Sequence, residues 1–105
     1  MLIQINTDDN IDKSSKSQEK TEAAIREVLE RFEELVTRVE VHLSDENSDK
    51  KSGSDDIRCL LEVRVEGRQP LAVTESAATV QQAVDGAARK MRRSLDSVLG
   101  KLQKR

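Results

Sequence analysis

The sequence predicts an α+β domain in which a four-stranded sheet carries two helices on one face, in the order βαβββα. Two long segments, near residues 17–36 and 76–102, repeat apolar residues at helical spacing, and four short segments alternate apolar and polar residues as strands do. Such elements bury their apolar faces against each other, so a two-layer sandwich is expected. The 105 residues suffice for one modest core, and we expect a single domain over residues 1–105.

The first predicted strand and helix occupy the N-terminal third of the chain. Residues 1–6 place Ile3 and Ile5 on one face and polar residues between them. A polar turn follows over residues 7–12. From about Ser17 to Val36 the apolar residues follow the i, i+3, i+4, i+7 rule of an amphipathic helix: Ile25, Val28, Leu29, Phe32, Leu35 and Val36.

Three further strands are predicted in the middle of the chain. Val39, Val41 and Leu43 alternate with polar residues, which indicates a strand with one buried face. Residues 45–56 lack apolar side chains and are expected to form a flexible loop. A longer alternating strand spans residues 57–65, and Gly67 permits a tight turn into the fourth strand. Pro70 indicates that this strand lies at an edge of the sheet or contains a bulge.

The last predicted helix begins near Ser76 or Thr79 and continues to about Leu102. On a helical wheel its apolar residues form one stripe and most of its cations lie on the far side. The stripe comprises Val80, Val84, Ala87, Met91, Leu95, Val98 and Leu102.

The charge of this last segment opposes that of the rest of the chain. From Gly86 onward there are seven basic residues and one acid, Asp96, whereas residues 1–85 hold 11 basic and 19 acidic residues. A basic block on an acidic chain points to a polyanion-binding surface. The candidate RNA-binding residues are the seven cations Arg89, Lys90, Arg92, Arg93, Lys101, Lys104 and Arg105.

The cations have an alternative explanation, in which they compensate the helix dipole or solvate an exposed face. This explanation suits Lys101, Lys104 and Arg105, which lie near the end of the helix, but Arg89–Arg93 lie mid-helix. Four cations within five residues repel one another unless an anion lies across them, so polyanion binding is favoured. With no Trp, no Tyr and one Phe, the chain lacks stacking platforms for bases. Contacts to phosphates and recognition of RNA shape are therefore expected.

Other chemistries find little support in the sequence. The single cysteine, Cys59, and the single histidine, His42, cannot form an internal disulfide or a Cys/His zinc site. We expect Cys59 to be a buried structural thiol and His42 to lie on the polar face of the sheet. The acidic pairs Asp8/Asp9 and Asp55/Asp56 lie in predicted turns. No enzymatic activity, metal, cofactor or small-molecule substrate is expected.

Neither a signal peptide nor a membrane segment is recognisable, so a cytoplasmic protein without a membrane partner is expected. The N-terminal residues have no basic region followed by an apolar run. No stretch of the chain approaches the roughly 18 consecutive apolar residues of a membrane-spanning helix.

Residues 61–95, LEVRVEGRQPLAVTESAATVQQAVDGAARKMRRSL, resemble the short hibernation-promoting factors, the ribosome-associated inhibitor or sigma-modulation family of bacteria. The chain carries the family pattern A-[IV]-D-x4-K-[LM]-x-R-x-L. The resemblance implies a fold similar in layout to double-stranded RNA-binding domains. It also implies binding to small-subunit rRNA in the decoding region, where the family excludes mRNA and tRNA under stress. Lys90 and Arg93 match the K and R of the pattern, and Lys101 matches a later family lysine.

Two departures from the family leave an alternative open. The first helix is rich in glutamate where typical members carry lysines, and Asp96 interrupts the basic run. Residues 8–56 hold 15 acids and 8 bases, so the alternative is a protein-interaction module that binds a basic protein through its acidic first helix or its polar sheet face. The dimerising C-terminal domain of long family members has no counterpart here, and a monomer is expected.

Overall fold

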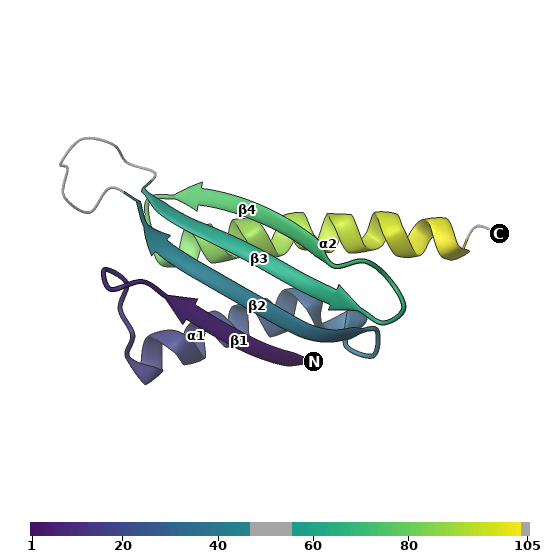
Figure 1. Ribbon diagram of the computed structural model, residues 1–105, viewed down its shortest axis with the longest axis horizontal. Coiled ribbons are helices and arrows are strands. Elements are labelled where there is room, and N and C mark those ends of the chain that lie inside the picture. The colour runs from purple at the N-terminus through teal and green to yellow at the C-terminus, as the bar shows by residue number, and fades with distance from the viewer. Residues whose placement is uncertain (47–55, 104–105) are drawn as a thin grey trace.

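The computed structural model describes residues 1–46 and 56–103, with side chains up to residue 99. The element order is βαβββα, as predicted, with one short 3₁₀ turn after the first helix (Figure 1). The elements are β1 (Leu2–Thr7), α1 (Ser15–Leu29), η1 (Glu30–Phe32), β2 (Val36–Asp45), β3 (Ile57–Val65), β4 (Leu71–Ala77) and α2 (Val80–Gln103).

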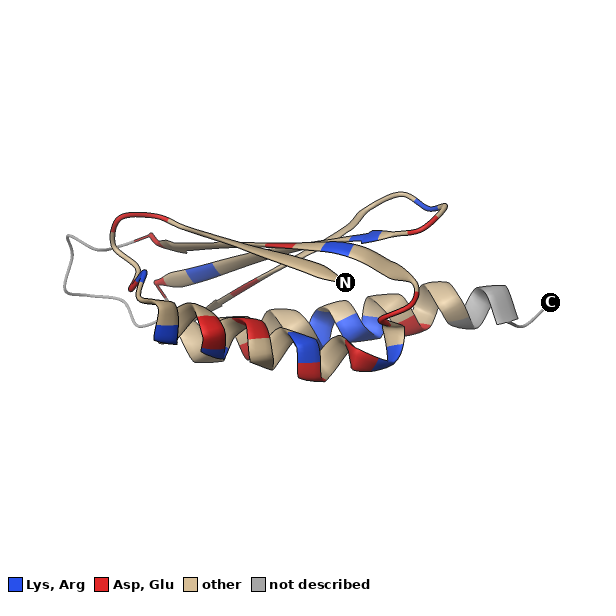
Figure 2. Ribbon diagram, turned by 90° about the horizontal axis from the view of Figure 1, so that it is seen from below, with Lys and Arg blue, Asp and Glu red and all other residues tan. Residues whose placement is uncertain are grey.

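The four strands form one mixed sheet in the order β1-β2-β3-β4. β1 pairs with β2 in parallel, and the other two pairings are antiparallel. Both helices lie on the same side of this sheet, so the molecule has two layers and one open sheet face (Figure 2). The predicted α+β class and helix placement are confirmed. β4 is an edge strand, as the proline before it indicated.

The core lies between the sheet and the helices because apolar side chains alternate along the strands. Val39, Val41 and Leu61 are fully buried on the helix side of β2 and β3. From the helices, Ile25 and Met91 meet them and are also fully buried. The sequence pattern assigns Ile11 to a polar turn, yet this residue is only 5% exposed and belongs to the core.

The prediction that the first helix continues to Val36 is wrong. α1 ends at Leu29, η1 tightens the chain through Phe32, and Val36 begins β2 opposite Val65. The backbone N–H of Leu35 donates to the carbonyl of Phe32, and the carbonyl of Leu35 accepts from Glu66, so this segment joins the sheet. Val36 is β-branched and buried in a strand. A helical wheel shows that such a residue is buried, but not whether a strand or a helix buries it. Leu35 is therefore 40% exposed.

The predicted loop at residues 45–56 begins later than expected. Asp45 is the last residue of β2, and the Glu46 N–H donates to the Asp56 carbonyl at 2.8 Å. Residues 47–55 lie outside the described part of the chain. Over the described residues, no helix combines the length and apolar character that crossing a membrane requires.

Candidate nucleic-acid interface

The first turn of helix α2 is capped, and the helix face toward the sheet is lined by small side chains. The Thr79 hydroxyl accepts a hydrogen bond from the Gln82 N–H at 3.1 Å, which fixes the first turn. Ala83, Ala87 and Ala88 are all fully buried. The small alanine side chains allow the helix backbone to lie near the strands.

Four cations of the predicted RNA-binding set are exposed on this helix, and we call them the α2 cation patch: Arg89, Lys90, Arg92 and Arg93. Met91 and Leu95 are fully buried on the opposite side of the same turns. This confirms that the four side chains point away from the core. Lys101 lies in the helical backbone but its side chain is outside the described residues, as are Lys104 and Arg105 entirely.

Lys90 is held by the neighbouring strand. Its ammonium lies 2.8 Å from a carboxylate oxygen of Glu75 and donates to the backbone carbonyl of Thr74, also at 2.8 Å. Both partners belong to β4, and the Glu75 side chain lies on its helix-facing side, at the register position opposite Cys59. The charge of Lys90 is thus balanced within the protein. No local sequence pattern signals this pair, because it depends on where α2 lies on the sheet.

Gly86 makes room for the Glu75 carboxylate. A Cβ atom at this position would lie 2.6 Å from Cγ and 2.7 Å from Oε2 of Glu75. Such distances are closer than side chains tolerate, so a larger residue at position 86 would displace the glutamate. The glycine therefore lets Glu75 lie flat against α2 within reach of Lys90.

An open groove of about 400 Å³ runs between β4 and α2 beside this pair. It is lined by Val73, Lys90, Arg93, Ser94 and Ser97. Two cations and two hydroxyls along one groove are the groups that bind phosphate oxygens in protein–nucleic acid contacts. The groove therefore extends the α2 cation patch toward the edge of the sheet.

Asp96, the one acid in the basic block, forms an ion pair with Arg31 of η1. The Arg31 guanidinium also lies 4.9 Å from the centre of the Phe32 ring. Because a cation from another element neutralises Asp96, this acid weakens the patch less than its place in the sequence suggests. The pair also ties the end of α1 and η1 to the middle of α2.

Helix α1 does not enlarge the patch. Its Arg26 pairs with Glu22 at 2.9 Å, and Lys20 lines a separate groove between the helices together with Thr79 and Asp85. Basic and acidic residues are mixed along the helix layer (Figure 2). The cations suited to a polyanion are therefore concentrated on α2.

The remaining candidates of the sequence have structural roles. Cys59 is fully buried, and desolvation together with the nearby Glu75 charge raises the pKa of its thiol to about 12. Such a thiol stays protonated and is a core residue, as predicted. The Asp8 carboxylate accepts from the N–H groups of Asn10 and Asp45 at 3.0 and 3.1 Å, which holds the turn after β1. Asp55 lies outside the described residues.

Comparison with known proteins gives a family match and two similar folds. Residues 3–103 match the family described as Sigma 54 modulation protein / S30EA ribosomal protein. The N-terminal domain of Protein Y from Thermus thermophilus is 18% identical, with a TM-score of 0.73 over 93% of this chain and 99% of that one. A ribosomal subunit interface protein from Coxiella burnetii is 14% identical, with a TM-score of 0.75 over 95% and 99%. No curated protein sequence matches significantly.

Proposed function

Because the chain belongs to the Sigma 54 modulation protein / S30EA ribosomal protein family, whose members are ribosome-associated hibernation factors and not enzymes, we propose that it silences translation by binding small-subunit rRNA. The α2 cation patch contacts phosphates in the decoding region. The bound domain then excludes mRNA and tRNA by steric occlusion. Such a protein acts in the cytoplasm and needs neither a cofactor nor a small-molecule substrate.

The observation that carries this proposal is the exposure of Arg89, Arg92 and Arg93 on α2, of which Arg93 lines the groove along β4. Guanidinium groups bind phosphate oxygens with two parallel hydrogen bonds, and the Ser94 and Ser97 hydroxyls line the same groove. The chain has no Trp or Tyr, and its one phenylalanine, Phe32, is buried in the core, so the described surface offers none of these three rings for stacking bases. Phosphate contacts and RNA shape therefore determine where the domain binds.

Sedimentation with purified small subunits tests the proposal. The variant Arg89→Glu/Arg92→Glu/Arg93→Glu should no longer co-sediment, because three attractive contacts become repulsive. Lys90 is left unchanged, since a glutamate there would face Glu75 and disturb the packing of α2. Translation in a reconstituted system should resume in parallel.

The matched control is Arg58→Glu/Arg64→Glu/Arg68→Glu. It makes the same change in net charge at exposed positions of β3 and the following turn, away from α2. Binding should be retained. Equal loss in both triple variants would mean that net charge, not the patch, controls association. Persistence of binding in the α2 variant would contradict the proposal.

The competing function, an interaction with a basic protein through acidic α1, gives a different result. Glu19 and Glu27 are exposed on α1 and provide the negative charge for such a contact. Pull-down from a lysate before and after ribonuclease treatment separates the two. Retention of a protein partner after RNA digestion, together with loss in Glu19→Gln/Glu27→Gln, would favour the protein-interaction module.

A further inference from the structure

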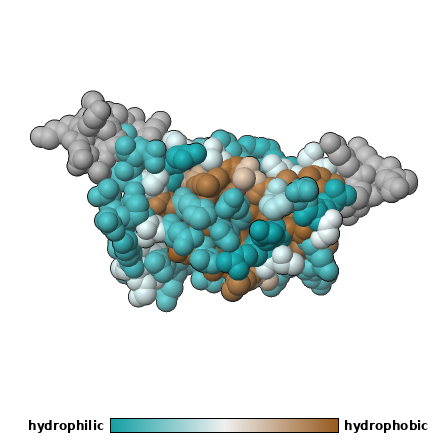
Figure 3. Space-filling model, viewed as in Figure 1, coloured by the Kyte–Doolittle hydropathy of each residue, from teal (hydrophilic) through white to brown (hydrophobic). Residues whose placement is uncertain are grey.

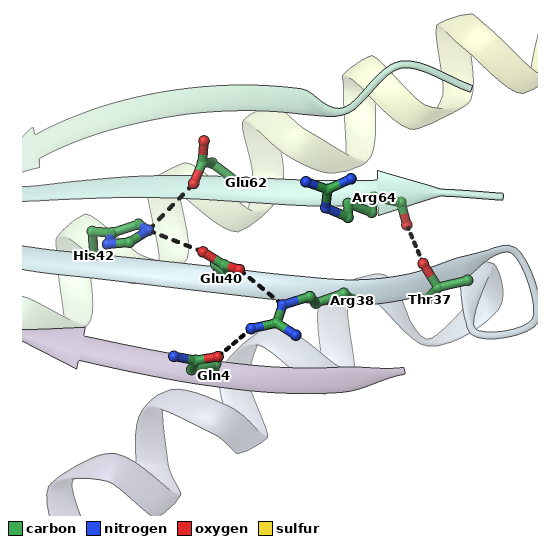
Figure 4. A network of polar contacts seen from close by, with 7 residues as sticks. All are labelled: Gln4, Thr37, Arg38, Glu40, His42, Glu62 and Arg64. Atoms are coloured by element: carbon green, nitrogen blue, oxygen red, sulfur yellow. Dashed lines mark hydrogen bonds and ion pairs between the residues drawn. The ribbon is translucent and has the colours of Figure 1, made fainter. Parts of the chain in front are cut away.

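A chain of polar contacts crosses the open face of the sheet, opposite the helices (Figure 4). Arg38 contacts Gln4 on β1 and donates through Nε to Glu40 Oε2 at 2.8 Å. His42 Nε2 lies 3.6 Å from Glu40 Oε1 and 3.3 Å from Glu62 Oε1. One imidazole nitrogen is thus approached by two carboxylates from different strands.

The strand register brings these three groups together. Glu40 and His42 alternate with buried core residues on β2, so both lie on the open face. Glu62 is the direct antiparallel partner of Glu40 on β3. The three ligand atoms all lie within 4.8 Å of one another, on the two central strands of the sheet. The sequence alone could not reveal this cluster, because residue 62 joins it only through the register.

The spacing of the ligand atoms fits a four-coordinate metal ion. Bonds of about 2.0–2.2 Å from zinc to nitrogen and oxygen place neighbouring ligand atoms of a tetrahedron roughly 3.3–3.6 Å apart. The separations from His42 Nε2 to the two carboxylate oxygens are 3.3 and 3.6 Å. Two of the three separations therefore match those of a tetrahedral site, and the two carboxylate oxygens lie within 4.8 Å of each other.

The surroundings of Glu40 favour the same arrangement. Arg38 binds Oε2 of Glu40 and leaves Oε1 turned toward His42, as an outer-shell partner of a metal-bound carboxylate does. Glu40 and Glu62 also line a shallow hollow of about 100 Å³, which leaves room for a water ligand. The face of the molecule seen in Figure 3 is hydrophilic over much of its area, with apolar patches between the polar side chains.

We propose that Glu40, His42 and Glu62 form a binding site for a divalent transition-metal ion such as Zn²⁺, with water completing the coordination. One imidazole and two carboxylates suit zinc and its neighbours better than Mg²⁺ or Ca²⁺, which prefer oxygen ligands alone. Arg38 and Arg64 line the hollow next to this site, so the bonds to the three ligands must offset the repulsion between these cations and the metal ion. This site lies on the face opposite α2 and does not depend on the proposed ribosome contact.

The single histidine permits a direct test on tag-free protein. Titration with ZnCl₂, followed by calorimetry and by the imidazole NMR signals of His42, should show one bound equivalent and a shift at Nε2. Co²⁺ should give the visible absorption of a four-coordinate ion. Glu62→Gln and His42→Gln should each abolish the heat of Zn²⁺ binding and the Co²⁺ absorption. The far-ultraviolet circular dichroism spectrum of both variants should be unchanged.

Two further variants sharpen the test. Arg38→Gln removes the partner that orients Glu40 and should weaken Zn²⁺ binding by roughly tenfold or more, as loss of an outer-shell partner does. Glu66→Gln removes an exposed acid just after β3 and should leave binding unchanged. No binding by the wild-type protein, or equal binding by Glu62→Gln, would overturn the proposal.

Discussion

Lys90 is the residue whose surroundings differ most from the sequence expectation. Its place in the family pattern makes it a candidate rRNA contact, but its ammonium is already paired with Glu75 and bonded to the Thr74 carbonyl. The two side chains remain 44% and 29% exposed. Ion pairs of this exposure are worth about 0.2–1 kcal/mol, so a phosphate can displace the glutamate. In the proposed complex with rRNA, Glu75 therefore competes with phosphate for Lys90.

Replacing Glu75 with Gln should consequently tighten binding to small subunits. The change removes the competing charge and keeps the shape of the side chain. The dissociation constant should therefore fall by at most about fivefold, the factor equivalent to the upper end of the range for an exposed ion pair. Filter binding at a fixed salt concentration measures this dissociation constant. Glu33→Gln, which removes the same charge near η1, should change affinity less. Equal effects of the two variants would show that Glu75 acts only through net charge.

Cys59 gives the protein a pH-dependent stability in the alkaline range. Burial raises the pKa of its thiol from 9.0 to about 12, so the folded state holds the proton where the unfolded state releases it. The contribution of the protonated thiol to the free energy of unfolding is complete below pH 9. It declines as pH rises toward 12, by at most about 1.4 kcal/mol per pH unit. Urea unfolding should show a steeper loss of stability above pH 9 in the wild type than in Cys59→Ala. Parallel curves would contradict this assignment.

At the scale of elements, the spacing of apolar residues predicted the structure: alternation indicated all four strands, and the helical period indicated both helices. The prediction succeeded because each element buries one face in a single core. It failed at the end of the first helix, where Leu35 and Val36 continue the helical period but join the start of β2. Periodicity records which residues are buried and not which partner buries them. The backbone turn at η1 ends the helix, so Leu35 and Val36 pack with the sheet and not with α1.

The same distinction applies to the candidate sites. A helical wheel places Arg89, Lys90 and Arg93 on an exposed face because this depends only on the 3.6-residue period of α2. The pairs between Lys90 and Glu75 and between Asp96 and Arg31 depend on how α2 packs against β4 and η1. Those contacts join distant parts of the chain, and a single sequence holds no local signal for them.

For the whole molecule, the two faces carry different kinds of charge. The helix side presents the α2 cation patch next to an acidic α1, and the open sheet face presents alternating acids and bases around His42. The chain carries a net charge of −2, so general attraction to RNA is absent. The proposed contact with rRNA therefore requires a fixed orientation, in which α2 is directed at the phosphates.

This dependence should appear in the effect of salt. Each phosphate contact that is lost lowers the slope of log affinity against log salt by about 0.7–0.9. Arg92→Gln/Arg93→Gln should therefore reduce the slope for small-subunit binding by roughly 1.5 relative to the wild type. Arg58→Gln/Arg64→Gln makes the same charge change on β3, where both side chains are exposed away from the core, and should leave the slope unchanged. An unchanged slope in the α2 variant would mean that Arg92 and Arg93 do not contact phosphate. Equal reductions of the slope in both variants would mean that the domain binds without a fixed orientation.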